Sequence, residues 1–288
     1  MKTLRECVKE ADEKGVAIGH FNISNMEALH AIYSAAKKLN VPIVIGLSSG
    51  EEKFVGIEEG VALVRAIRER DNYPIFLNAD HHHSFEEVKA CIDAGFDCVI
   101  IDGAELSFDE NVKVTKECVD YARLVTKATG RDILVEGELG FIGSGSVIRD
   151  SIPEGAGIKT KPEEAKKFVE LTGIDMFAPS VGNIHGIVRS GNPHIDPNLV
   201  KEIREAVGIP LVLHGGSGLH DSDFTDGIKM GISTVHINTE IRVAFVEALK
   251  KSLADKPDEV VPYKVSKPAQ DAVESVVLER LKLFNHIR

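Results

Sequence analysis

The feature that most constrains the fold is an alternation, along the whole chain, of short apolar runs with longer segments of helical periodicity. The runs are rich in Val and Ile and are bounded by Gly, Pro or charged residues, as buried strands are. The expected strands are Val16–Gly19, Val41–Gly46, Pro74–Ala79, Asp97–Ile101, Asp132–Glu136, Asp175–Ala178, Pro210–Leu213 and Thr234–Ile237. Between them, apolar residues recur every three or four positions. The clearest helical segments are Met26–Leu39, Phe85–Ala94, Asn111–Thr129, Pro162–Thr172 and Pro197–Val207.

Eight strands separated by helices predict an α/β fold, the (β/α)8 or TIM barrel. A chain of 288 residues, 43% of them hydrophobic, has the length and the core-forming content for one such barrel. Because no linker-like segment divides the chain, we expect a single domain over residues 1–288. It would include a C-terminal extension over about 255–288, with an additional helix from about Ala269 to Phe284.

The overall charge and the cysteine content exclude several classes of protein. The formal net charge of −11 argues against a broad surface for nucleic acid or anionic membrane, since either favours a basic patch. No apolar run approaches the roughly 20 residues of a membrane span, and the N-terminus lacks the apolar stretch of a signal peptide. The four cysteines lack zinc-ribbon spacing and are too few for a disulfide scaffold, so we expect them to be reduced and mostly buried. These features favour a cytoplasmic protein.

Three histidines stand where expected strands end. His81 follows the third strand, His185 the sixth and His214 the seventh. Because active sites of (β/α)8 barrels lie at the carboxyl ends of the strands, this fold can bring the three imidazoles together. Three neutral imidazoles are a common ligand set for catalytic Zn²⁺ and leave the ion an open position for substrate. The pattern therefore predicts a catalytic zinc site rather than a structural one.

Asp80 directly precedes the first of these histidines and would lie beside a metal-bound substrate. A carboxylate in that position can move a proton to or from a hydroxyl group. The alternative is that Asp80 orients an imidazole by accepting its N–H group. His82 and His83 complete a run of three histidines, but neighbouring residues cannot all face one metal. We expect these two behind the ligands or at the surface.

Glycines and hydroxyl groups near the last two strands predict an anion site beside the metal. Gly186 and Gly215 each follow one of the histidines and allow backbone N–H groups to approach a ligand. Ser217 adds a hydroxyl group, and Thr239 precedes a helix expected from Ile241, whose N-terminus favours phosphate. Thr239 alone could equally be a helix N-cap. Such local groups can hold an anion despite the negative net charge, so a phosphorylated substrate is not excluded.

The longest irregular stretch, Phe141–Lys161, contains several glycines. That composition suits a mobile loop over an active site. The alternative interpretation is a poorly packed surface excursion.

Short motifs at the expected strand ends follow one another in a fixed order. They are Gly19-His20-Phe21-Asn22, Ser48-Ser49-Gly50 with Lys53 and Gly56, Asp80-His81, Ile101-Asp102-Gly103, Glu136-Gly137-Glu138-Leu139-Gly140, His185-Gly186 and Leu213-His214-Gly215-Gly216-Ser217. In this order, over nearly the whole chain, they resemble the class II, zinc-dependent family of fructose-bisphosphate and tagatose-bisphosphate aldolases. The order of the motifs carries the resemblance rather than any single one.

The resemblance implies that His81, His185 and His214 bind Zn²⁺, with a monovalent cation near the substrate phosphate. It implies reversible cleavage of a ketose bisphosphate, with fructose 1,6-bisphosphate as the first candidate, to dihydroxyacetone phosphate and an aldehyde such as glyceraldehyde 3-phosphate. Asp80 would exchange the proton of the aldehyde-derived hydroxyl, and zinc would stabilise the enediolate. A homodimer or homotetramer is implied as well. The residues expected to contact substrate or phosphate are Gly186, Gly215, Ser217, His236, Asn238, Thr239, Ser48 and Asn22, while Asp102 and Glu138 match acidic positions that offer an alternate metal position or support the ligands from behind.

Two residues depart from the family pattern. The family usually has an asparagine that contacts the enediolate where this chain has His236, whose N–H group could take that role. The mobile loop of the family commonly carries a glutamate where this chain has Ser146, and Asp150 or Glu154 could compensate.

Three other functions remain open. They are a tagatose-bisphosphate or other ketose-phosphate aldolase, a zinc hydrolase, and a catalytically silent partner subunit. A Schiff-base aldolase is disfavoured, because no lysine occupies the expected sixth or seventh strand.

Overall fold

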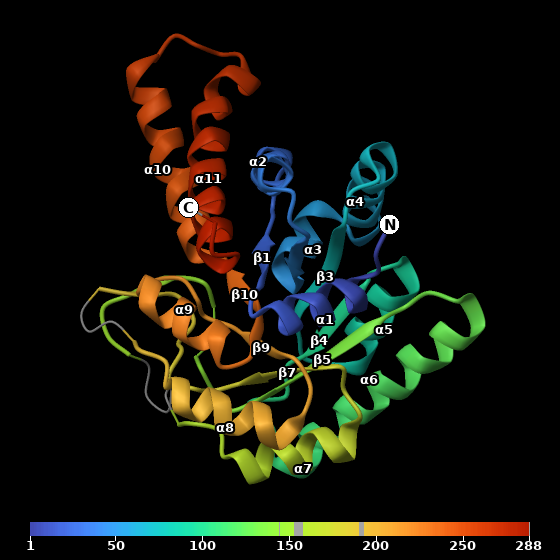
Figure 1. Ribbon diagram of the computed structural model, residues 1–288. Coiled ribbons are helices and arrows are strands. Elements are labelled where there is room, and N and C mark those ends of the chain that lie inside the picture. Colours follow the sequence, from blue (N-terminus) through green and yellow to red (C-terminus); the bar gives the residue numbers. More distant parts are fainter. Residues whose placement is uncertain (144, 153–157, 190–192, 288) are drawn as a thin grey trace.

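The computed structural model describes residues 1–143, 145–152, 158–189 and 193–287 (Figure 1). Within this part of the chain, eight parallel strands close into a barrel in the order β1-β10-β9-β7-β5-β4-β3-β2. The expected (β/α)8 architecture is therefore confirmed. The barrel strands are β1 Ile18–Asn22, β2 Ile43–Ser48, β3 Ile75–His82, β4 Cys98–Ile101, β5 Leu134–Leu139, β7 Met176–Pro179, β9 Leu211–Leu213 and β10 Ile232–Ile237.

Several strands run further toward their carboxyl ends than their apolar residues predict. β1 continues through His20 to Asn22, and β3 continues through Asp80 to His82. Backbone pairing does not require apolar side chains, so apolar periodicity underestimates the length of a strand that ends in polar residues. Part of the polar rim therefore belongs to the rigid barrel wall.

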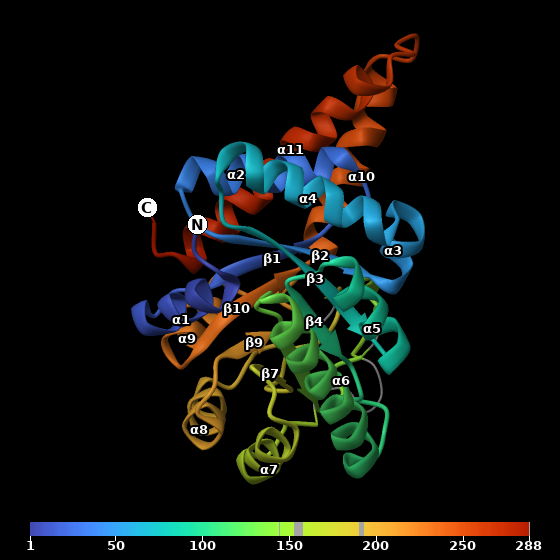
Figure 2. The ribbon, with the colours of Figure 1, turned by 90° about the vertical axis from the view of Figure 1, so that its right-hand side faces the viewer.

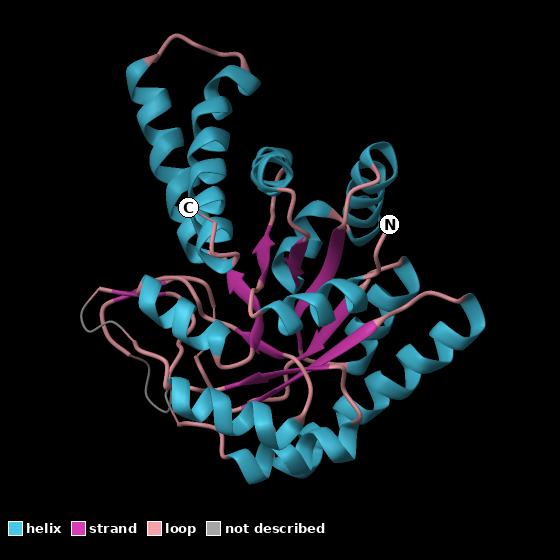
Figure 3. Cartoon of the chain, in the orientation of Figure 1, coloured by secondary structure: helices cyan, strands magenta, loops and turns pink. Residues whose placement is uncertain are grey.

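Helices surround the barrel (Figure 3). Four of them, α2, α5, α7 and α8, have the expected bounds, while α6 begins at Phe108 rather than at Asn111 because Ser107 and Glu110 form a capping box. The helices of the described residues are α1 Leu4–Lys14, α2 Met26–Leu39, α3 Ser49–Val55, α4 Ile57–Asp71, α5 Phe85–Ala94, α6 Phe108–Thr129, α7 Pro162–Thr172, α8 Pro197–Val207, α9 Asp221–Lys229, α10 Thr239–Asp255 and α11 Pro262–Phe284.

Helix α1 closes the amino end of the barrel. Its buried face, which includes Leu4 and Val8, packs against side chains that point into the barrel from the first residues of the strands, such as Ile18, Val44 and Phe76. A second, larger core lies between the strands and the surrounding helices. With the amino end filled by apolar side chains, the opposite, carboxyl end is the one left for a site.

The last two helices form a hairpin that projects from the barrel (Figures 1 and 2). Helix α11 begins at Pro262, so the expected start near Ala269 is wrong. Proline is favourable at the first helical position, and Pro268 removes only one interior hydrogen bond, so the helix continues through it. The carboxyl half of α11 returns to the barrel, where Leu281 and Phe284 are fully buried.

The segment Phe141–Lys161 is not wholly irregular. It contains the short strand β6 (Ile148–Arg149), which pairs in parallel with β8 (Ile187–Val188), just after His185 and Gly186. Residues 153–157, including Glu154, lie outside the described residues. The segment is thus joined to the loop after β7 that carries His185, and its function as a mobile loop stays a prediction.

Two expectations about composition can be compared with the structure. All four cysteines are buried and free of disulfide bonds, as expected. Among the described helices, none combines the length and the apolar composition that a membrane span requires.

Candidate active site

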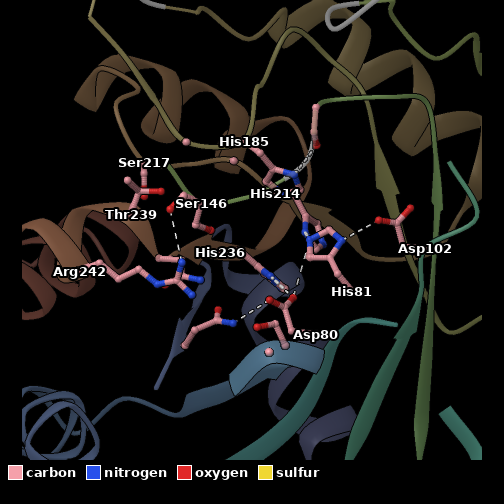
Figure 4. A pocket seen from close by; sticks show the side chains of 18 of the residues that line it. Asp80, His81, Asp102, Ser146, His185, His214, Ser217, His236, Thr239 and Arg242 are labelled. Atoms are coloured by element: carbon pink, nitrogen blue, oxygen red, sulfur yellow. Dashed lines mark hydrogen bonds and ion pairs between the residues drawn. The ribbon is translucent and has the colours of Figure 1, made fainter. Parts of the chain in front are cut away.

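A cavity of about 320 Å³ opens at the carboxyl ends of the barrel strands (Figure 4). Nearly all the residues expected to form the site line it, although they come from segments far apart in the sequence. Glu138 is the exception, because it is buried behind His81, with its Oε2 3.6 Å from Nδ1 of that histidine. The lining residues that the sequence predicted are Asn22, Ser48, Asp80, His81, Asp102, His185, Gly186, His214, Gly215, Ser217, His236, Asn238 and Thr239.

A bulge in β3 brings His81 to the cavity. The register between β3 and β4 shifts between Ala79 and His82, and His81 has a φ of 52°, in the left-handed region that a side chain other than glycine rarely adopts. Nε2 of the buried His82 lies 2.9 Å from Oε2 of Glu52 on α3, which anchors the bulge from behind. The left-handed backbone at His81 is strained, and it turns the His81 ring into the cavity while His82 points away from the cavity.

Each of the three clustered imidazoles is oriented by an oxygen on its outer side. Nδ1 of His81 donates to Asp102 at 3.0 Å, and Nδ1 of His185 donates to the carbonyl of Gly143 at 2.8 Å. Nε2 of His214 donates to Glu136 at 2.6 Å. An imidazole that donates from one nitrogen presents the lone pair of the other, so the three inner nitrogens face one another as acceptors.

The inner nitrogens lie close enough to share one cation. Nε2 of His81 and Nδ1 of His214 are 2.9 Å apart, and the ligand atoms of all three histidines lie within 4.8 Å of one another. Converging lone pairs repel one another unless a positive charge lies between them. The donor set and its outer hydrogen bonds therefore fit a metal ion of the kind that prefers imidazole.

The electrostatics of the cluster also favour a cation. Burial lowers the pKa of His185 to about 3, so this imidazole is neutral, as a ligand must be. Burial would lower the pKa of His81 too, but the charge of Asp80 and the hydrogen bond to Asp102 outweigh it and raise that pKa to about 10. The negative charges of the carboxylates around His81 therefore favour a positive charge at its position. Burial, followed by the nearby charge of Asp102, raises the pKa of Glu138 well above its usual range.

Asp80 is a buried carboxylate held beside the cluster. Its Oδ2 accepts a hydrogen bond from Nδ2 of Asn22 at 2.8 Å, and its Oδ1 lies 3.3 Å from Nδ1 of His236. Burial opposes its ionisation, but a positive charge at the position of His81, whether on the imidazole or on a bound cation, and the contact with His236 outweigh burial and hold the pKa of Asp80 well below its usual range. An ionised carboxylate at the cavity wall can accept a proton from a hydroxyl group.

Sequence reasoning missed two residues that support Asp80 through Asn22. The same amide group of Asn22 also donates to Glu51 at 2.8 Å, and Glu51 pairs with Arg242 at 2.5 Å. Glu51 is buried because it completes a capping box with Ser48 at the start of α3. The Ser-x-x-Glu spacing after the second strand was the signal that could have revealed Glu51. Arg242 gave no such signal.

The predicted anion site lies on the other side of the cavity. Gly186 and Gly215 have φ values of 91° and 60°, and an added Cβ would lie 2.2 Å from the carbonyl oxygen of Val147 or 2.5 Å from that of Ile184. Only glycine therefore fits at either position. Thr239 is the first residue of α10 and not its N-cap, which is Asn238, and the N-terminus of this helix faces the cavity. A helix N-terminus beside glycine-rich turns fits an anion such as phosphate.

The remaining expected residues are distributed as follows. His82 is buried and His83 is largely exposed, as expected, although His83 reaches the cavity rim. Ser146 lines the cavity, and its carbonyl accepts a hydrogen bond from Arg242 at 3.4 Å. Asp150 instead pairs with Arg189 at 2.9 Å, on an exposed part of the surface.

Comparisons with known proteins show the family of this chain. Residues 2–287 match the family described as fructose-bisphosphate aldolase class-II. A fructose-bisphosphate aldolase of Geobacillus stearothermophilus is 36% identical over 285 residues, which cover 98% of this chain and 96% of the relative. The structure of the YdjI aldolase from Escherichia coli K12 matches with a TM-score of 0.81 at 30% identity, over 98% of this chain and 96% of that one. This chain therefore belongs to the class II fructose-bisphosphate aldolase family and is an aldolase, a carbon–carbon lyase.

Proposed function

We propose that the protein is a zinc-dependent aldolase that reversibly cleaves fructose 1,6-bisphosphate to dihydroxyacetone phosphate and glyceraldehyde 3-phosphate. The observation that carries the proposal is the convergence, in one cavity, of a cluster of three imidazoles, the buried carboxylate of Asp80 and a helix N-terminus. The relatives whose names state this substrate support the choice of fructose 1,6-bisphosphate. Tagatose 1,6-bisphosphate is the closest alternative.

His81, His185 and His214 would hold the metal ion through their inner nitrogens. A bound Zn²⁺ would polarise the ketose carbonyl and stabilise the negative charge that develops on its oxygen. Asp102 and Glu136 then act on the ligands, because each fixes the tautomer and the orientation of one imidazole. Glu138 lies behind His81 and offers an alternate metal position.

The chain's own polar groups would bind and orient the substrate. The backbone at Gly186 and Gly215, the hydroxyl of Ser217 and the N-terminus of α10 at Asn238 and Thr239 would hold the phosphate of the ketone half. Ser48 and Asn22 lie on the opposite wall, next to Asp80, where the aldehyde half would lie. Binding at two ends fixes the bond to be broken near the metal and the carboxylate.

Asp80 would accept the proton of the C4 hydroxyl group. As that proton leaves, the C4 oxygen becomes the aldehyde carbonyl, and the bonding pair of C3–C4 moves into the ketone half. Protonation at C3 then completes dihydroxyacetone phosphate. In the direction of synthesis, Asp80 returns its proton to the new hydroxyl group.

A matched comparison of substrates tests the reaction and its stereochemistry. Zinc-loaded protein is given fructose 1,6-bisphosphate or tagatose 1,6-bisphosphate, and triose phosphate and inorganic phosphate are both measured. We expect triose phosphate, with fructose 1,6-bisphosphate as the better substrate. Release of inorganic phosphate alone would identify a hydrolase, and no turnover of any ketose phosphate would identify a silent partner subunit.

We also propose that residues 1–288 form one domain that assembles into a homodimer or homotetramer. Burial of Leu281 and Phe284 against the barrel supports a single domain, which calorimetry would show as one unfolding transition. The projecting α10–α11 hairpin exposes the apolar side chains of Leu253, Val260 and Tyr263, which supports assembly. Light scattering of the purified protein would give its mass directly.

A further inference from the structure

Two histidines stack face to face beside Asp80, in the wall of the barrel. His20 on β1 and His236 on β10 are direct neighbours in the parallel ladder, and their ring centroids are 3.5 Å apart with an interplanar angle of 3°. Both side chains are buried. Neither ring nitrogen of His20 has a hydrogen-bond partner among the described residues. Two buried imidazoles with unsatisfied nitrogens are costly, so their placement calls for a function.

The stacked pair is poorly suited to bind a metal ion, although its nitrogens and the carboxylate of Asp80 lie within 4.8 Å of one another. An imidazole binds a metal along its lone pair, in the plane of the ring. The lone pairs of two stacked rings lie in separate parallel planes, here with ring centroids 3.5 Å apart, so an ion shared by both would lie far out of at least one plane. The geometry instead leaves Nδ1 of His236 as a polar group directed at Asp80.

The carboxylate of Asp80 is contacted from two sides. Asn22 donates to Oδ2 at 2.8 Å, and Oδ1 lies 3.3 Å from Nδ1 of His236. Figure 4 shows the ring of His236 directed at Asp80. An ionised carboxylate can only accept hydrogen bonds, so its contact with Nδ1 favours the tautomer of His236 that carries the proton on that nitrogen. Oδ1 itself has no hydrogen-bond partner among the described residues, so Asn22 holds one oxygen of the carboxylate while the ring of His236 limits the space open to the other.

His20 fixes the ring of His236 from behind. The other face of His236 lies against His214, with ring centroids 4.0 Å apart, so the ring is enclosed between two imidazoles. Gly46 on β2 makes room for His20, because a Cβ there would lie 2.3 Å from Cε1 of His20. The backbone of three neighbouring strands is thus arranged around this pair.

We propose that His236, backed by His20, is a positioning residue that orients the carboxylate of Asp80 toward the hydroxyl group of the aldehyde half. This inference rests on the proposed function, in which Asp80 transfers that proton. His236 acts through Asp80 and not on the ketone half of the substrate. Misplacement of a catalytic group by about 1 Å can lower the rate on the order of a hundredfold, so a residue that keeps the carboxylate of Asp80 in place should increase the rate of cleavage.

Two reactions of the zinc-loaded protein separate these roles. Cleavage of fructose 1,6-bisphosphate requires proton transfer by Asp80. Exchange of the carbon-bound hydroxymethyl proton of dihydroxyacetone phosphate with deuterated water involves no aldehyde hydroxyl and does not. His236→Phe keeps a flat ring and removes the N–H group. We expect it to lower kcat of cleavage on the order of a hundredfold and to leave proton exchange and KM within about twofold.

Companion variants separate orientation from loss of structure. His236→Asn keeps an N–H donor near the place of Nδ1 and should retain cleavage within about fivefold of the unchanged chain. His20→Ala removes the ring behind His236 and should cost on the order of tenfold in kcat of cleavage, again without loss of exchange. Bound zinc after dialysis and the thermal midpoint are measured for each variant, so that an unfolded or metal-free protein is recognised.

The comparison with Asp80→Ala decides whether the effect passes through Asp80. In the Asp80→Ala background, His236→Phe should lower the residual cleavage by less than about twofold, because the group that it orients is already gone. If the effects of His236→Phe and Asp80→Ala on the rate of cleavage multiply fully in the double variant, the proposal is overturned. An equal loss of proton exchange and of cleavage in His236→Phe would overturn it too. If Asp80→Ala itself cleaves at the unchanged rate, the proposed function of Asp80 fails instead.

Discussion

Nε2 of His214 donates a hydrogen bond to Oε1 of Glu136 at 2.6 Å, and both side chains are almost completely buried. The contact fixes which nitrogen of His214 faces the cavity. A carboxylate behind an imidazole also increases its basicity, and so its affinity for a metal ion. This pair links the barrel interior to the proposed zinc site.

Replacement of Glu136 by Gln should weaken zinc binding by about 10- to 100-fold. The neutral amide orients His214 less firmly, and the negative charge that increases the basicity of this imidazole is lost. Competition with a chelator of known affinity measures the change, and added zinc should restore turnover. Glu170→Gln on the exposed face of α7 is the matched control and should bind zinc as the unchanged chain does. Unaltered affinity in Glu136→Gln would separate this carboxylate from the metal.

Replacement of Gly215 by Ala should raise KM for the bisphosphate at least tenfold on the proposed function, because the added Cβ forces the phosphate-binding turn away from the carbonyl of Ile184. Initial rates over a range of substrate concentrations give KM. Gly130→Ala is the control, since Gly130 also has a positive φ but lies in open space at the end of α6. It should lower stability by about 1 kcal/mol and leave KM unchanged. Equal KM effects in the two variants would argue against a phosphate site at Gly215.

Arg280 on the C-terminal helix α11 contacts the segment that is proposed to bind phosphate. Its guanidinium donates to both oxygens of Glu240, at 2.8 and 2.9 Å, and Glu240 accepts a hydrogen bond from the backbone of Gly218. Arg280→Met should lower the free energy of unfolding by about 2 kcal/mol, because Glu240 is left as a mostly buried charge. It should also raise KM severalfold. Urea titration and initial rates measure the two effects.

Lys251→Met is the control for Arg280, because Lys251 forms an exposed ion pair with Asp255 within α10. Exposed pairs contribute less than about 1 kcal/mol, so this variant should differ little from the unchanged chain. If Arg280→Met is as stable as Lys251→Met, the contact between Arg280 and Glu240 contributes nothing measurable to the free energy of unfolding.

Stability should decline at alkaline pH because of the buried thiols. Burial raises the pKa of Cys7 from its ordinary value near 9.0 to about 11. Above pH 9.0 the unfolded chain loses this proton while the folded chain keeps it, so the stabilising effect is complete below pH 9.0 and is lost as the pH rises through about 11. The slope from one such thiol is up to about 1.4 kcal/mol per pH unit.

Urea titrations at several pH values between 9 and 11 measure this decline. Cys7→Ala should make the free energy of unfolding fall less steeply with pH, because the contribution of this thiol is removed. A Cys7→Ala variant whose stability falls with pH as steeply as that of the unchanged chain would contradict the assignment.

Iodoacetamide should label the thiols of the folded protein only slowly at neutral pH, since only the thiolate reacts.

The fold was predictable because its signals are local and repeated. Apolar runs and amphipathic segments alternate along the chain, and each barrel strand was expected near its observed position. The bounds of α6 and α11 were missed where other forces decide them, namely a capping box at Ser107 and a tolerated Pro268. The cluster of His81, His185 and His214 was predictable because the fold gathers the carboxyl ends of its strands.

The supporting residues were harder to predict, because their function depends on contacts between distant segments. Glu51 reaches Asn22, and Glu52 reaches His82, only after α3 folds against the barrel. The stacking of His20 on His236 requires the register of β1 against β10 and the space left by Gly46. The Ser-x-x-Glu spacing could have pointed to Glu51, but no spacing in the sequence predicts these contacts between distant segments.

The most direct measurement is triose-phosphate release from fructose 1,6-bisphosphate by zinc-loaded protein, before chelation, after chelation and after zinc is returned. A metal-dependent aldolase should release triose phosphate, stop on chelation and recover with zinc, while treatment with borohydride and substrate leaves it active. Cleavage that survives complete removal of the metal, or that borohydride and substrate abolish, would contradict a zinc site at His81, His185 and His214.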